Sequence, residues 1–247
     1  MEEAIIIEKG VIIVAVFAIT MLFAMYCTLA ERKIAAWIQD RRGPNRAGPG
    51  GILQPLADGL KLFAKEEFMP NTPNTFLFVF GPFISMTMAL MTSAVIPWGD
   101  TLEIGGRKVV LQAADINVAM LYVFAVLSVS VYGVMIGGWA SNNKYSLISA
   151  MRVASQMISY EIAMGLSIVA ILMMHSSMSL REIAAGQHEM HWNIFYQPLG
   201  FFIFLICSFA ETNRTPFDLA ECEQELIGGY HTEYSSMRMG FFLFAEY

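Results

Sequence analysis

Charged residues are scarce in this sequence. Only 15% of its 247 residues are Asp, Glu, Lys or Arg, whereas 56% are hydrophobic. An ordinary soluble domain carries about 25% charge, and disordered chains combine high charge with low hydrophobicity. The composition therefore excludes a disordered or collagen-like chain, and it predicts an all-α, polytopic bundle of membrane-spanning helices.

Cysteine spacing and basic clusters are also missing. Cys27 and Cys207 lie in apolar runs and Cys222 lies in an acidic segment, with no CxxC motif for zinc or an iron–sulfur cluster. No cluster of Lys and Arg indicates nucleic acid. A Walker loop, a GxGxxG motif and a histidine pair for haem are absent too. If electrons are involved, we expect another subunit to carry them.

Five apolar runs reach the roughly 20 residues that a spanning helix needs. They cover residues 11–29, 76–98, 116–140, 150–175 and 192–210. The chain starts with acidic residues and has no basic n-region, so the first run is an uncleaved helix. A sixth run, 239–247, stops partway. We interpret residues 1–247 as a single membrane domain that is incomplete at its C-terminus.

The distribution of Lys and Arg predicts the orientation of these spans. The connections 30–75, 140–151 and 211–238 are rich in cations and should face the cytoplasm, which puts the N-terminus outside. The cytoplasmic cations are Arg32, Lys33, Arg41, Arg42, Arg46, Lys61, Lys65, Lys144, Arg152, Arg214 and Arg238. The opposite side has Lys9, Arg107, Lys108 and Arg181.

Short elements are expected on the outer side. Residues 101–104 and 107–111 flank two glycines, which predicts a β-hairpin. Ser179 and Glu182 have the spacing of a capping box, and Gly186 is a stop signal. A short helix should therefore lie between Ser179 and Gly186.

The first cytoplasmic connection, residues 31–46, has two interpretations. Its cations suit a positive-inside anchor. That anchor does not explain Glu31, which closes the first span. A carboxylate at the membrane edge weakens such an anchor, so Glu31 is a candidate functional residue.

An amphipathic helix is predicted over residues 52–68. Gln54, Asp58, Lys61 and Lys65 follow at i, i+4, i+7 and i+11 and share one helix face. About 17 residues with these charges should lie in the membrane interface and not cross it. The helix is either a membrane-surface brace or the lip of an opening for a lipid-soluble ligand.

Glu161 lies well inside the fourth predicted span. A charge near the bilayer centre costs about 2.5–3.5 kcal/mol on insertion scales. Such a residue is a functional candidate, and a protonated, hydrogen-bonded structural Glu is the alternative. Arg152 is nine positions away, about half a turn round the helix, so the two should not pair.

The third cytoplasmic connection is strongly acidic. Thr215-Pro216 followed by Asp218 predicts a helix start, with a stop at 228–229. Acids at i, i+3 and i+7 on that helix repel one another, which favours a carboxylate cluster that passes protons over a solvated loop or a docking surface. The acids are Glu211, Asp218, Glu221, Glu223, Glu225 and Glu233.

Two stretches of the sequence resemble signatures of one family. They are residues 31–46 with 48–58, and residues 209–221. The family is the H subunit of the bacterial proton-pumping NADH–quinone oxidoreductase, respiratory complex I, whose mitochondrial counterpart is NADH dehydrogenase subunit 1. The resemblance covers the whole chain, and the family has eight spanning helices. Cys222 and Ala163 depart from its usual pattern.

The resemblance implies roles for particular residues. Quinone-side residues would be Glu31, Arg32, Asp58 and Phe217, with Gln54 and Lys61 on the entrance helix. The proton path would comprise Glu161, Glu211, Asp218, Glu221, Glu223, Glu225, Glu233 and Glu246. The chain would form the quinone chamber and its entrance, and would couple quinone reduction to proton translocation.

The resemblance also implies the setting. The substrate would be ubiquinone or menaquinone, and the chain would be a non-redox subunit of the translocase with no complete active site. Flavin and iron–sulfur clusters would belong to partner subunits of the membrane arm and the quinone-proximal peripheral arm. The chain would cross the bacterial inner membrane with a periplasmic N-terminus. A component of a membrane-bound hydrogenase, a secondary transporter and a structural anchor are the alternatives.

Overall fold

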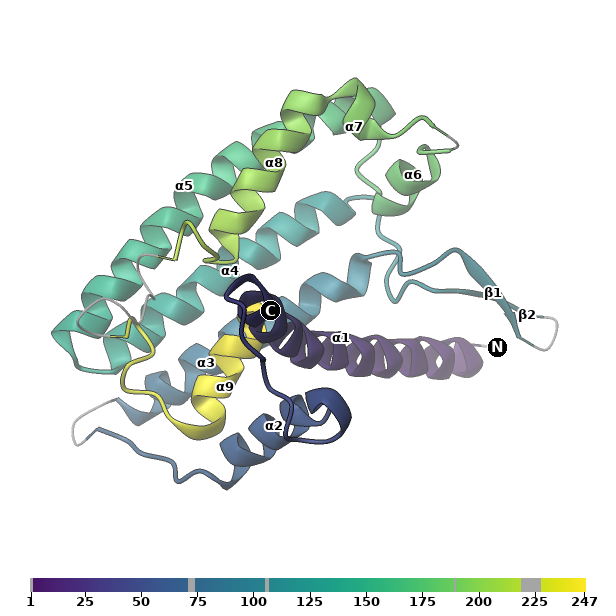
Figure 1. Ribbon diagram of the computed structural model, residues 1–247. Helices are drawn as coiled ribbons and strands as arrows, with labels where there is room; N and C mark the ends of the chain where they lie inside the picture. The colour runs from purple at the N-terminus through teal and green to yellow at the C-terminus, as the bar shows by residue number, and fades with distance from the viewer. Residues whose placement is uncertain (1, 71–73, 105–106, 189, 219–227) are drawn as a thin grey trace.

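A computed structural model describes residues 2–70, 74–104, 107–188, 190–218 and 228–247. Among these residues, four helices are long and apolar enough to cross a membrane. They are α1 (Glu2–Ile38), α3 (Thr75–Thr92), α4 (Ala119–Ala140) and α5 (Lys144–His175). The predicted all-α membrane architecture is confirmed at this level, and α4 and α5 run side by side with α8 (Figure 1).

The fifth predicted span is divided in two. It comprises α7 (Asn193–Tyr196) and α8 (Pro198–Glu211), which are separated at Gln197 because Pro198 opens the second helix. The 14 residues of α8 reach about 21 Å, shorter than the roughly 30 Å hydrocarbon core. The sixth run corresponds to α9 (Ser236–Glu246). A fifth and a sixth span therefore stay predictions.

Two spanning helices are longer than their apolar runs predict. α1 continues to Ile38, because no Gly or Pro interrupts its backbone hydrogen bonds before Gly43. α5 starts at Lys144 and not near residue 150, since the Asn143 side chain accepts a hydrogen bond from the Tyr145 N–H at 3.0 Å. Glu161 thus lies about 25 Å along α5, near its middle.

Small residues let α3, α4 and α5 approach closely. A Cβ added at Gly81 on α3 would lie 2.9 Å from the Cα of Gly137 on α4. One added at Gly138 would lie 2.3 Å from the Cβ of Ala150 on α5. Gly133 and Gly137 are four residues apart, the spacing of close helix pairs in membranes. Backbone contact between helices therefore shapes the centre of the bundle.

The outer elements match their predictions, with one correction. Strands β1 (Thr101–Ile104) and β2 (Arg107–Val110) pair antiparallel, and α6 (Leu180–Ala185) is capped by the Ser179 side chain. The Glu182 side chain does not complete the predicted capping box. It accepts a hydrogen bond from the Ser177 hydroxyl, which in turn accepts the Ser179 N–H at 3.1 Å.

The predicted interfacial helix is shorter than expected. α2 spans Gln54–Ala64, because the backbone becomes extended at Lys65. A 3₁₀ turn, η1 (Pro49–Gly51), precedes it and lies against the α1–α2 connection. Gly51 has φ +83°, and a Cβ there would lie 2.0 Å from the Pro44 carbonyl oxygen. Only glycine fits this contact, which fixes α2 beside the end of α1.

α9 is anchored by a buried tyrosine just before it. The Tyr234 hydroxyl lies 3.1 Å from the Phe78 carbonyl oxygen and 3.2 Å from that of Gly137. Its ring stacks on Phe78 and meets Phe242 of α9 edge-on. Burial raises the pKa of Tyr234, so its hydroxyl keeps the proton that it donates. This core fixes α9 between α2 and α3 (Figure 1).

The predicted helix start at Thr215 is wrong. Residues 215–218 form a turn, in which the Phe217 N–H donates to the Arg214 carbonyl at 2.7 Å. The Phe217 carbonyl accepts a hydrogen bond from the Gln156 side chain, and its ring packs on Tyr160. Contacts with α5 thus override the local capping signal. The rest of that predicted helix lies outside the described residues.

Candidate functional site

Two cavities lie on either side of the C-terminal end of α9. The α2 cavity, between α1, α2 and α9, has a volume of about 530 Å³. The α3 cavity, between α1, α3, α4, α8 and α9, has a volume of about 340 Å³. Phe244 and Tyr247 line both cavities. The end of α9 is therefore a shared wall.

The α2 cavity has an apolar wall and a charged rim. Three of the predicted quinone-side residues, Glu31, Arg32 and Asp58, line it. Met25, Leu62 and the side chains of α9 supply the apolar surface. The other lining residues are Thr28, Ala35, Arg41, Pro44, Pro55, Gly59, Gly240, Leu243, Phe244 and Tyr247.

Asp58 is the centre of the polar rim. Arg32 Nη1 lies 2.6 Å from Asp58 Oδ2, and Gln54 Nε2 donates to Asp58 Oδ1 at 2.9 Å. Lys61 Nζ lies 4.0 Å from the same carboxylate. The predicted polar stripe of α2 therefore faces α1. Because more than half of the Arg32 side chain is exposed, the pair contributes about 0–1 kcal/mol to stability and mainly orients Arg32.

Glu31 is paired from a distant part of the sequence. Both of its oxygens accept hydrogen bonds from Arg214 Nη1, at 3.1 and 3.2 Å. The Tyr247 hydroxyl also donates to Glu31. The Arg214 guanidinium lies 4.1 Å from the centre of the Tyr247 ring, which is a cation–π contact. The residues after α8 and α9 thus close the α2 cavity over Glu31.

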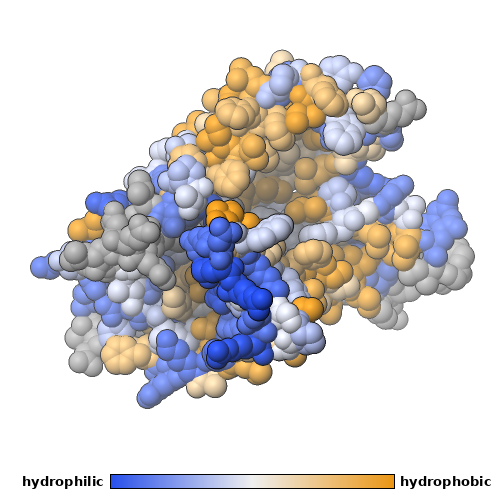
Figure 2. All heavy atoms as spheres, viewed as in Figure 1, coloured by the Kyte–Doolittle hydropathy of each residue, from blue (hydrophilic) through white to orange (hydrophobic). Residues whose placement is uncertain are grey.

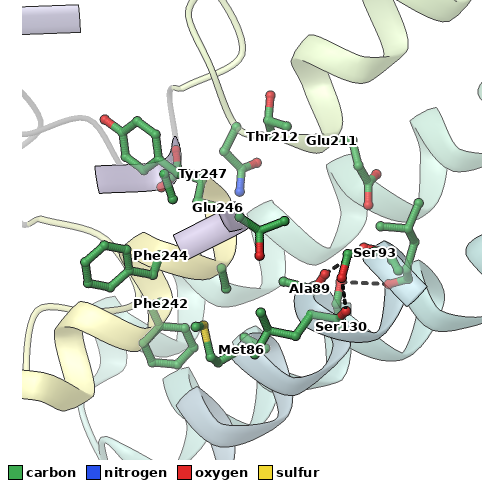
Figure 3. Close-up of a pocket in the computed structure, with 18 of the residues that line it drawn as sticks. Met86, Ala89, Ser93, Ser130, Glu211, Thr212, Phe242, Phe244, Glu246 and Tyr247 are labelled. Atoms are coloured by element: carbon green, nitrogen blue, oxygen red, sulfur yellow. Dashed lines mark hydrogen bonds between the residues drawn. The ribbon is translucent and has the colours of Figure 1, made fainter. Parts of the chain in front are cut away.

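The α3 cavity contains two of the predicted proton-path carboxylates. Glu211 at the end of α8 and Glu246 at the end of α9 both line it, together with the hydroxyl-bearing Ser93 and Ser130 (Figure 3). The Oε2 atom of Glu211 is buried and accepts no hydrogen bond from the described residues. Buried polar atoms normally have a partner. This carboxylate is therefore poised to take up a proton or a water.

Arg214 joins the two cavities. Its Nε lies 3.3 Å from Glu246 Oε1 in the α3 cavity, while its Nη1 holds Glu31 in the α2 cavity. The Glu246 side chain is only 15% exposed, so screening by water is weak there. A change of charge at Glu31 is therefore transmitted to Glu246 through one shared guanidinium.

Asp218 lies near this network in the turn after α8. Burial raises its pKa, repulsion from Glu31 raises it further, and attraction to Arg214 opposes both. Phe217, the other predicted residue of this turn, does not line the α2 cavity and instead packs on Tyr160 of α5.

The remaining proton-path residues lie in three places. Glu161 accepts a hydrogen bond from Ser128 of α4, and it lies close enough to Glu211 for charge repulsion. Glu233 accepts one from the Asn143 side chain at 2.7 Å, at the start of α5. Three further acids, and the neighbouring cysteine, lie outside the described residues: Glu221, Glu223, Glu225 and Cys222.

Sequence reasoning misses three residues of the site. By sequence alone, Arg214 is one more cytoplasmic cation, Arg41 is part of an anchor, and Tyr247 is the end of an apolar run. One signal points to Arg214, because it is the only cation among the acids of residues 211–233. Nothing in the sequence indicates Tyr247.

Fold and site together define the class: an integral membrane protein in which a charged network separates two cavities. The family model described as NADH dehydrogenase matches residues 11–247. The H subunit of NADH-quinone oxidoreductase from Flavobacterium johnsoniae is 73% identical over the whole chain, which covers 71% of that relative. The corresponding protein of Flavobacterium psychrophilum is also 73% identical, with 72% covered. The first H subunit of Cytophaga hutchinsonii is 64% identical over 98% of the chain, with 71% covered.

The chain belongs to the family of NADH-quinone oxidoreductase H subunits, the membrane subunits of respiratory complex I. The resemblance inferred from residues 31–58 and 209–221 is thereby confirmed. Membership in a multi-subunit oxidoreductase gives the chain other complex I subunits as partners.

Proposed function

We propose that the α2 cavity is the part of a quinone chamber that opens to the bilayer. Glu31, Arg32 and Asp58 steer the polar head of the quinone, with Gln54 and Lys61 along the entrance helix. Ubiquinone and menaquinone both combine such a head with an apolar tail, and Phe217 contributes from the turn beyond Arg214. Flavin and iron–sulfur clusters of partner subunits supply the electrons.

The size and lining of the α2 cavity support this proposal. Its volume of about 530 Å³ falls within the roughly 300–1,000 Å³ of small-molecule sites. Its wall is mostly apolar, as an isoprenoid tail requires, and its few polar groups are concentrated at one rim. Lining residues from α2, the interfacial helix, give a lipid-soluble ligand a route from the membrane.

The second part of the proposal concerns coupling. The observation that carries it is the bridge from Glu31 through Arg214 to Glu246, which connects the two cavities. Reduction of a quinone creates negative charge and a demand for protons. Added charge near Glu31 competes for Arg214, weakens its hold on Glu246 and favours proton uptake there.

From Glu246 the proposed proton path continues through Glu211 to Glu161, with Asp218 at its cytoplasmic side. The further acids of the path are Glu221, Glu223, Glu225 and Glu233. The chain acts as a non-redox subunit of the translocase. It lies in the bacterial inner membrane with its N-terminus in the periplasm, in contact with the membrane arm and the quinone-proximal peripheral arm.

A photoreactive quinone tests the chamber in the assembled complex. We expect it to label α2 and the end of α1, and excess unlabelled quinone should prevent the labelling. Asp58→Asn should weaken labelling severalfold, because Arg32 loses its partner. Asp115→Asn is the matched control, since Asp115 pairs with Arg181 on the outer side. Labelling confined to other helices, or undiminished by unlabelled quinone, would contradict the proposal.

A further inference from the structure

A third cavity lies on the other side of the α1 end from the proposed chamber. It has a volume of about 460 Å³ and is formed where the chain after α1 folds back on the helix. The approach is close at Gly43, where an added Cβ would lie 3.2 Å from the Cα of Lys33. We call it the basic groove. Its lining includes Lys33, Ile34, Trp37, Arg41, Arg42 and Asn45.

Positive charge in the basic groove is not neutralised by the protein. Among the described residues, no carboxylate lies within 4.0 Å of the cationic groups of Lys33, Arg41 or Arg42. Lys33 donates to the Gly50 carbonyl, and Arg41 Nε donates to the Gln39 side chain at 2.7 Å. Asp40, the one acid between these cations in the sequence, does not line the groove. Three cations thus face one concave surface.

Apolar side chains beside the groove face outward. Trp37 is 83% exposed and Ile38 is 80% exposed, and both belong to the last turn of a helix that is apolar enough to span the membrane. Tryptophan is enriched where the hydrocarbon core meets the headgroups. Figure 2 shows a hydrophilic band across the region of the α1–α2 connection, bordered by hydrophobic surface. The groove therefore combines a membrane-facing apolar edge with cations at headgroup level.

We propose that the basic groove binds the phosphate headgroup of an anionic phospholipid. The phosphate lies between Lys33, Arg41 and Arg42, and the acyl chains run along the exposed apolar face of α1. Guanidinium groups suit phosphate because they present several donors in one plane. A soluble acidic partner would use the cations but would leave Trp37 and Ile38 exposed, so the apolar edge favours a lipid.

Each cation near an anionic membrane surface strengthens binding about fivefold. The proposal therefore predicts selectivity for phosphatidylglycerol over phosphatidylcholine, which has no net charge. Arg42 is the cleanest probe of this selectivity, because it lines the groove and not the α2 cavity.

The test uses the assembled complex in vesicles that contain equal amounts of phosphatidylglycerol and phosphatidylcholine. A photoreactive benzoylphenylalanine replaces Trp37, or Ile34 in a second variant, and the captured molecules are identified by mass spectrometry. We expect phosphatidylglycerol to be captured about fivefold more often than phosphatidylcholine. The same group at Trp139, an exposed residue at the end of α4, should capture both lipids at the vesicle ratio.

Further variants and a competitor decide between the occupants. Arg42→Gln should abolish most of the enrichment, whereas Arg46→Gln, an exposed cation outside the groove lining, should preserve it. Enrichment that is insensitive to Arg42→Gln would overturn the proposal. Capture of a partner subunit at positions 34 and 37 would do so too. Loss of the enrichment in millimolar inorganic phosphate would identify a site for free phosphate and would also overturn it.

Discussion

Arg214 is the residue on which the proposed coupling depends. It is shared by Glu31 and Glu246, and its guanidinium also rests on the Tyr247 ring. One cation between two carboxylates neutralises at most one of them. The network is therefore sensitive to any added negative charge, which is the property that a coupling element requires.

Tyr247 is predicted to tune Glu31 through its hydroxyl. Tyr247→Phe keeps the ring under Arg214 and removes the hydrogen bond to Glu31. One such bond contributes about 0.5–1.5 kcal/mol, so the KM for quinone should rise about two- to tenfold in steady-state assays. Tyr122→Phe, which removes a bond to the Met91 carbonyl near the outer side, is the control. Equal KM values for wild type and Tyr247→Phe would show that Glu31 does not contact the head.

Asp218 should make stability depend on pH. Because burial raises its pKa in the folded protein, the folded state binds the proton more tightly than the unfolded state. Its contribution is therefore lost as the pH rises above the ordinary Asp value of 3.8. Asp218→Asn should raise the thermal unfolding temperature at neutral pH, and the gain should shrink in acid. A constant difference between the variant and wild type at all pH values would refute this.

At the scale of elements, helix packing sets the position of both cavities. α3 and α4 meet through glycines, and α9 is fastened to that pair by Tyr234 and Phe242. Phe242 also lines the α3 cavity. A shift between α3 and α4 would therefore move the wall that carries Glu246.

Gly81→Ala tests this packing. The new Cβ would meet backbone atoms of Gly133 and Gly137 at 2.9–3.0 Å, and backbone cannot rotate away. Overpacking of this kind costs about 1–3 kcal/mol, so the variant should lower the amount of assembled complex on native gels. Gly165→Ala in α5 is the matched control, because nothing lies within 4 Å of its added Cβ. Equal losses in both variants would argue against tight α3–α4 contact.

Local patterns predict the elements well. Apolar runs locate α1, α3, α4 and α5, since the length of such a run follows from bilayer thickness. The β-hairpin strands and α6 follow from turn and capping signals. The patterns fail where tertiary contacts compete, as in the turn at Phe217, which is held by Gln156 and Tyr160. They also fail where a helix continues past its apolar run, as α1 does.

At the scale of the whole molecule, the site depends on contacts that no local pattern encodes. Glu31 and Arg214 are 183 positions apart, and Glu31 and Tyr247 are 216 apart. The sequence points to Glu31, Asp58, Glu211 and Glu246 singly, through their unusual positions and the family resemblance. It does not indicate that one arginine joins Glu31 to Glu246, because that follows from how α8 and α9 pack against α1.

The central claim is that Arg214 couples quinone reduction to proton movement. Its most direct test is the number of protons translocated per quinol formed, measured in proteoliposomes that contain the assembled complex with Arg214→Gln. Arg181→Gln, which removes a cation paired with Asp100 and Asp115 on the outer side, is the control. We predict a lower proton ratio in Arg214→Gln and an unchanged ratio in the control. An unchanged ratio in Arg214→Gln, with quinone reduction intact, would contradict the account.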